Sequence, residues 1–115
     1  MTRARTGSHM LEADLQSAVI ELARTLGYLV YHTHDSRKSA PGFPDLVMAH
    51  PRSGGLVFAE LKTATGRVTA EQDAWLRALA VRGAAFLWRP EHLADGSIGR
   101  ALMRYARTME PEGQP

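Results

Sequence analysis

The chain contains the segment Gly42-Phe43-Pro44-Asp45-Leu46-Val47 and, after a turn rich in glycine, the segment Phe58-Ala59-Glu60-Leu61-Lys62. Apolar residues dominate both segments, so we expect two strands, at 45–49 and 56–62, that form a hairpin. Because the strands of a hairpin are antiparallel, the start of the first strand lies beside the end of the second. We therefore expect the carboxylates of Asp45 and Glu60 and the ammonium group of Lys62 to lie close together.

The other elements are predicted from hydrophobic periodicity and turn residues. Thr69 and Gln72 have the spacing of a capping box, so a helix is expected to begin there and to bury Trp75, Leu76 and Leu79. The predicted order αβββαβα places helices at 11–26, 69–83 and 97–108, strands at 28–31, 45–49, 56–62 and 84–88, and a loop at 34–42. This order indicates an α/β fold with a central mixed β-sheet flanked by helices.

The length and composition indicate one small globular domain. The chain has 115 residues and a mass of 12.6 kDa, which is enough for a single core. Residues 11–108 are expected to fold, whereas 1–10 are expected to be a disordered N-terminal segment and 109–115 a flexible tail. Within the first segment, Gly7-Ser8-His9-Met10 resembles the short remnant that an expression vector leaves, and a native origin is the alternative.

Several classes of protein are excluded by what the sequence lacks. No apolar run approaches the ~18 residues of a membrane span, and polar residues 7–9 follow the basic start where a secretory signal would be apolar. The absence of cysteine excludes disulfides, thiolate zinc ligands and a cysteine nucleophile. We expect a cytoplasmic protein that does not bind a membrane. The formal net charge of +2 is too small to indicate nucleic-acid binding by itself.

The expected cluster of Asp45, Glu60 and Lys62 is typical of a metal-dependent hydrolase. Two adjacent carboxylates repel each other unless a cation lies between them. Mg²⁺ accepts one or two carboxylates together with water and phosphate oxygens, and it can polarise a phosphodiester. Next to two carboxylates, Lys62 should carry its positive charge. We assign it to orienting the attacking water and stabilising the transition state.

The first helix contributes a third acidic residue. On a helical wheel, Glu12 and Gln16 fall at the edge of the buried face, toward the sheet. Glu12 could complete the outer sphere of the metal, with Gln16 as a secondary candidate. Structural explanations remain open for the acidic residues: Glu60 and Lys62 could be an ion pair at a strand end, and Glu12 could stabilise a helix N-terminus.

Further candidates lie in the loops and at the first strand. Arg37, Lys38 and Arg67 are in segments rich in Gly, Ser or Pro, where basic residues often contact DNA phosphates; a solvated loop is the alternative. His32 and His34 are secondary candidates for substrate contact. They could also hold zinc, but the folded part offers only His50 and His92 as further histidine ligands.

In these motifs the chain resembles the PD-(D/E)xK nuclease superfamily, and it is most similar to small VRR-NUC domains of phages and bacteria. The resemblance rests on Gly42-Phe43-Pro44-Asp45, Glu60-Leu61-Lys62, the preceding helix with Glu12 and the following helix with Gln72.

The resemblance implies a restriction-endonuclease-like core and a nuclease that hydrolyses DNA with Mg²⁺ or Mn²⁺. It implies that Asp45, Glu60 and the Leu61 carbonyl bind the metal, that Lys62 is catalytic, and that Glu12 supports them. Gln72 is expected near the DNA, although its capping role is an equally good explanation. Family analogy also favours branched, flapped or four-way DNA as substrate, and cutting a four-way junction needs two sites and hence a homodimer.

Two other functions remain open at this stage. The chain could be a non-catalytic DNA-binding module with the same fold, or, less favoured, a zinc hydrolase built on His32 and His34. Loss of cleavage on changing Asp45, Glu60 or Lys62 would support the nuclease over either alternative.

Overall fold

The structure, a computed structural model, describes residues 10–33 and 40–107. Within this part it is an α/β fold in which a four-stranded mixed sheet is flanked by helices, as predicted. The elements in chain order are α1 (Glu12–Thr25), β1 (Leu29–His32), β2 (Leu46–Ala49), β3 (Leu56–Leu61), α2 (Ala70–Ala80), β4 (Ala84–Trp88), α3 (Pro90–Ala94) and α4 (Ser97–Ala106).

The sheet has the strand order β1-β2-β3-β4. The first three strands are antiparallel neighbours, and β4 pairs with β3 in parallel. Leu46 of β2 lies opposite Ala59 of β3, so the residue before β2 reaches the end of β3. The predicted hairpin is therefore confirmed, and its register brings Asp45 to Glu60.

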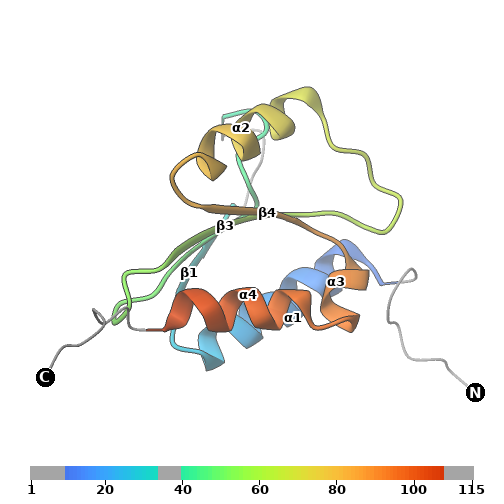
Figure 1. Ribbon diagram of the computed structural model, residues 1–115. Coiled ribbons are helices and arrows are strands. Elements are labelled where there is room, and N and C mark those ends of the chain that lie inside the picture. Colours follow the sequence, from blue (N-terminus) through green and yellow to red (C-terminus); the bar gives the residue numbers. More distant parts are fainter. Residues whose placement is uncertain (1–9, 34–39, 108–115) are drawn as a thin grey trace, which may run out of the picture.

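Helices cover the two faces of the sheet unequally. Figure 1 shows α2 alone on one face and α1, α3 and α4 on the other. The core lies on the three-helix face, because every second strand residue points there. Its members are apolar and buried: Leu15, Val19 and Ala23 of α1, Leu46 and Met48 of β2, Val57, Ala59 and Leu61 of β3, Ala84 and Trp88 of β4, and Ile98 and Leu102 of α4.

A buried histidine joins the end of α1 to the β2–β3 turn. His50 Nε2 lies 2.8 Å from the Leu26 carbonyl, so this nitrogen carries the proton and donates it. The other ring nitrogen, Nδ1, accepts from the backbone amides of Arg52 and Ser53 at 3.3 and 3.2 Å. Gly27, at φ 97°, gives the close approach, because a Cβ there would lie 2.9 Å from His50 Nε2.

The structure differs from the sequence prediction in three places. A five-residue helix, α3, was missed because it is too short to show periodicity, and it makes the order αβββαβαα. The second helix ends at Ala80, and Trp75, Leu76 and Leu79 are half-buried because only this helix covers its face of the sheet. Met10, assigned to the disordered segment, packs against the core.

The expected disorder of residues 1–9 and 109–115 lies outside the described residues. Among the helices that the structure describes, none has the length and apolar character needed to cross a membrane.

Candidate active site

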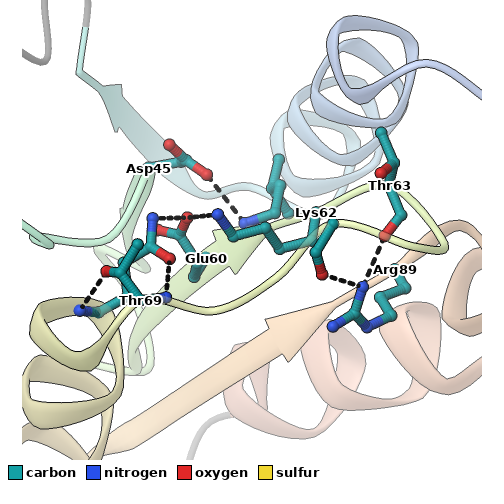
Figure 2. A network of polar contacts seen from close by, with 9 residues as sticks. Asp45, Glu60, Lys62, Thr63, Thr69 and Arg89 are labelled. Carbon is teal, nitrogen blue, oxygen red and sulfur yellow. Dashed lines mark hydrogen bonds and ion pairs between the residues drawn. The ribbon is translucent and has the colours of Figure 1, made fainter.

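The cluster predicted at the ends of β2 and β3 is present. Asp45 precedes β2, and its Oδ2 accepts a hydrogen bond of 2.8 Å from the backbone amide of Leu61 in the last position of β3. Figure 2 shows Asp45 and Glu60 side by side, with Lys62 directed toward Glu60. Residues that lie far apart in the sequence thus meet where the start of β2 lies beside the end of β3.

Glu60 is at the centre of this cluster. It is 3% exposed, and its Oε2 accepts a hydrogen bond of 2.9 Å from Gln72 Nε2 and lies 3.8 Å from Lys62 Nζ. Glu60 follows Phe58 on the α2 face of β3, so the strand alternation directs its carboxylate away from the core and toward α2. A buried carboxylate is thus held between one amide and one ammonium group.

The same Gln72 side chain also begins α2. Its Oε1 accepts from the Thr69 amide at 2.9 Å, while Thr69 Oγ1 accepts from the Gln72 amide at 3.1 Å, which completes the predicted capping box. Capping and contact with the site are therefore simultaneous roles, not competing ones. Since both ends of the amide are used within the protein, Gln72 is placed to hold Glu60. Its expected contact with DNA stays a prediction.

The segment before Asp45 is held by α2. Gly42, at φ 84°, passes so close to the start of α2 that a Cβ would lie 2.4 Å from the Glu71 carbonyl carbon. Phe43 makes edge-to-face contacts with Phe58 of β3 and Trp75 of α2, at ring-centre distances of 6.4 and 5.1 Å. Glycine, the aromatic ring and the following proline thus fix the backbone that carries Asp45.

The carboxylates of this site share a negatively charged, partly desolvated environment. The pKa of Glu60 is raised to about 7, chiefly by burial and then by the charge of Asp45, against a lowering effect of Lys62. Burial also raises the pKa of Asp45, although the Leu61 amide and Lys62 act in the opposite direction. Glu12, at the start of α1, also has a raised pKa, first from burial and then from Asp45.

The donor set fits a divalent cation with few protein ligands. Glu60 Oε1 is buried and has no hydrogen-bond partner, so one carboxylate oxygen is available in a site with excess negative charge. Within residues 10–33 and 40–107, no group of three or more His, Cys, Asp or Glu residues forms a ready-made metal cage. Mg²⁺ matches this arrangement, because it commonly binds through one or two carboxylates and keeps several waters.

The remaining candidates lie around this cluster or outside the described residues. His34, Arg37 and Lys38 lie outside them. Arg67 is exposed in the loop between β3 and α2, and half-buried Gln16 lies one turn after Glu12 on α1. His32 ends β1 opposite Leu46, next to the strand position of Asp45.

The further histidines considered for zinc have structural positions. His50 bonds the backbone of α1 and of the β2–β3 turn, as described above, and His92 Nδ1 accepts from the Arg89 amide at 2.9 Å. Neither is grouped with His32 in a metal-binding cluster among the described residues.

Arg89 was not singled out from the sequence as a site residue. Its Nη1 donates to the carbonyls of Thr63 and Gly66 at 2.6 and 2.8 Å and lies 3.4 Å from that of Ala64. Figure 2 shows Arg89 beside the loop that follows Lys62. Sequence reasoning missed this role, because contacts from a guanidinium group to backbone carbonyls have no sequence pattern.

This sheet, with its acidic residues and lysine at the ends of two central strands, has the restriction-endonuclease-like architecture of PD-(D/E)xK nucleases. The model of the VRR-NUC domain family matches residues 6–87. The chain therefore belongs to the VRR-NUC family, a class of nuclease-type DNA-binding domains. The match includes all of Gly7-Ser8-His9-Met10, which resembles the remnant of an expression tag in the sequence. Neither a curated protein nor a solved structure matches the chain significantly.

Proposed function

We propose that the protein is a metal-dependent endonuclease that hydrolyses DNA phosphodiester bonds at the cluster of Asp45, Glu60 and Lys62. The observation that carries this proposal is the buried Glu60 carboxylate, which is held by Gln72 and faces Lys62 but keeps one oxygen without a partner. A carboxylate buried in this way is costly unless a cation compensates its charge.

Asp45, Glu60 and the Leu61 carbonyl would hold Mg²⁺ or Mn²⁺, with Glu12 in a supporting outer position. The ion supplies Lewis-acid chemistry to a phosphodiester when bound. Gln72 keeps the Glu60 carboxylate in one orientation, and the Leu61 amide does the same for Asp45. Lys62, whose ammonium group lies beside Glu60 at the end of β3, orients water and stabilises the added negative charge of the transition state.

DNA would be bound by basic residues around the cluster of Asp45, Glu60 and Lys62. Exposed Arg67 lies in the loop between Lys62 and α2, where it can reach a backbone phosphate. Arg37 and Lys38 precede Asp45 in the sequence. The short chain offers little surface for reading bases. We therefore propose recognition of DNA shape, such as branches, flaps and four-way junctions.

A four-way junction requires two cuts, and hence a homodimer. Within the described part of the chain, β1 is an edge strand that pairs with β2 alone. Leu29, Tyr31 and Leu56 are exposed on the sheet face beside this edge. An open edge flanked by apolar side chains is suited to a second copy. Its test is the mass in solution at the concentrations used for cleavage.

The function is tested with labelled linear, nicked, flapped and four-way DNAs, incubated with Mg²⁺, Mn²⁺ or EDTA. Wild type should cut with either metal ion and not with EDTA, and should prefer branched substrates. Asp45→Asn, Glu60→Gln and Lys62→Ala should abolish cleavage while the circular dichroism spectrum stays that of wild type. Undiminished cutting by these variants would refute the site.

The second candidate function, a non-catalytic DNA-binding module, predicts a different result in the same assay. The protein would shift DNA in a gel but would not cut it with either metal ion. The buried Oε1 of Glu60, which has no hydrogen-bond partner among the described residues, favours the catalytic function. An ion pair of Glu60 and Lys62 with a purely structural role has no need of such an oxygen.

A further inference from the structure

Arg89 bonds a loop that lies next to the candidate active site. In the structure, Arg89 itself makes no contact with the carboxylates of that site. The loop from Lys62 to Thr69 connects the end of β3 with the start of α2, and its first turn has the Gly66 amide 3.3 Å from the Thr63 carbonyl. The guanidinium group of Arg89 holds this turn from outside by bonding the carbonyls of Thr63 and Gly66. Single turns of this length have little stability of their own.

The turn also lies beside the side chain of Lys62. A Cβ placed on Gly66 would lie 3.4 Å from Lys62 Cδ, so the turn passes within one methyl group of the aliphatic part of the lysine. Lys62 has three rotatable bonds beyond Cβ, and its ammonium group would sample many positions without such a neighbour. A turn fixed at this position leaves the lysine less room to turn away from Glu60, whose Oε2 lies 3.8 Å from Nζ.

Hydrogen bonds also hold the backbone of Arg89 and of the residue before it. The Arg89 amide donates to His92 Nδ1, and the Arg89 carbonyl accepts from the His92 amide, both at 2.9 Å, within the first turn of α3. The preceding residue, Trp88, accepts from the Lys62 amide at 3.0 Å. Residues 88 and 89 therefore act on Lys62 in two places. Trp88 bonds its backbone amide, and Arg89 bonds the turn that lies beside its side chain.

We propose that Arg89 is a positioning residue, which fixes the loop after Lys62 and thereby keeps the lysine ammonium group beside Glu60 for DNA hydrolysis. This inference rests on the proposed nuclease function. Arg89 acts through Lys62 and not on the DNA, so its loss should slow the chemical step and leave binding of DNA almost unchanged. A displacement of about 1 Å in a catalytic group commonly lowers a rate by about 100-fold.

The first test compares Arg89→Met, Arg89→Lys and a control, Arg82→Met, which removes a positive charge from an exposed position. We expect Arg89→Met to lower the single-turnover rate at saturating DNA by about 10- to 100-fold and to change the Kd for DNA by less than about threefold. Arg89→Lys should retain part of the rate, because an ammonium group can bond one or two of the carbonyls.

The second test does not depend on activity. In metal-free protein, hydrogen exchange of amides 63–67 should be at least tenfold faster in Arg89→Met than in wild type, with the protection of β2, β3 and α1 unchanged. If wild type does not cut DNA, the proposed function fails, and this comparison still shows whether Arg89 holds the loop. The proposal is overturned if Arg89→Met cuts at the wild-type rate, if its loss of rate follows a general loss of protection, or if Arg89→Lys has unchanged exchange and no activity.

Discussion

Gln72 Nε2 donates a hydrogen bond of 2.9 Å to Glu60 Oε2 while the other end of the same amide caps α2. The start of the helix and the orientation of the buried carboxylate therefore depend on one side chain. Two substitutions can separate these roles, because the other partner of the capping box, Thr69, does not contact Glu60 in the structure.

We expect Thr69→Ala to lower the free energy of unfolding by about 1 kcal/mol and to leave cleavage within about twofold, because it removes only a cap. Gln72→Glu keeps an oxygen for the Thr69 amide but places a second carboxylate against Glu60. It should keep most of the stability and lower cleavage at least tenfold. Denaturant unfolding and initial cleavage rates measure both effects. Equal losses of activity in the two variants would show that Gln72 acts only through the helix.

The raised pKa of Glu60 predicts a pH-dependent stability of the metal-free protein. Since the folded state holds the proton up to about pH 7 and the unfolded state releases it near the ordinary value, the folded state binds more protons between these values. The free energy of unfolding should therefore fall as pH rises from about 4.5 to 7, by at most about 3 kcal/mol from this group.

Urea unfolding in EDTA at several pH values measures this fall, and Glu60→Gln serves as the comparison because it has no titrating group. The variant should be the more stable protein above pH 7 and should lose most of the pH dependence in this window. An equal slope in wild type and Glu60→Gln would show that Glu60 is not the group responsible.

Gly42 should be essential for the position of Asp45. Gly42→Ala places a Cβ against the backbone of α2 and also forces alanine into a left-handed conformation, so we expect a loss of about 3 kcal/mol and of most cleavage. Gly54→Ala is the matched control, since Gly54 has a φ of 75° but open space around it. It should cost about 1 kcal/mol and leave cleavage unchanged. Similar losses in both variants would exclude the contact with α2 as the cause.

His50 should stabilise the fold without affecting the chemistry. His50→Phe keeps the edge-to-face packing on Tyr28 but removes bonds to the backbone of Leu26, Arg52 and Ser53. At about 1 kcal/mol for each hydrogen bond, the loss should be about 2 to 3 kcal/mol. Thermal unfolding measures it, and the cleavage rate of the folded fraction should equal that of wild type. A change in that rate would connect the β2–β3 turn to the site.

The sequence predicted the parts of this structure that local patterns determine. Alternation and turn residues are sufficient to predict the β2–β3 hairpin, and antiparallel pairing alone places Asp45 next to the end of β3, as the structure has it. The capping box at the start of α2 could be predicted in the same way, from the spacing of Thr69 and Gln72. The fold class was predictable because apolar residues recur at helical spacing in the longer segments, whereas the strands are short apolar runs bounded by turn residues.

Contacts between distant elements could not be predicted in the same way. Nothing local in Arg89-Pro90 indicates that the guanidinium group reaches the carbonyls of residues 63 and 66. The close approach of Gly42 to α2 likewise depends on how the helix lies over the sheet. Gln72 was recognised as a cap, but its bond to Glu60 requires the register of β3 against α2.

Anomalous scattering from crystals soaked in Mn²⁺ shows whether Asp45 and Glu60 together hold a divalent cation. We expect one strong anomalous peak within bonding distance of a carboxylate oxygen of Asp45 and of Glu60, and its loss in Glu60→Gln crystals. A map with no peak between these two carboxylates, from crystals of a protein that cuts DNA with Mn²⁺, would contradict this expectation.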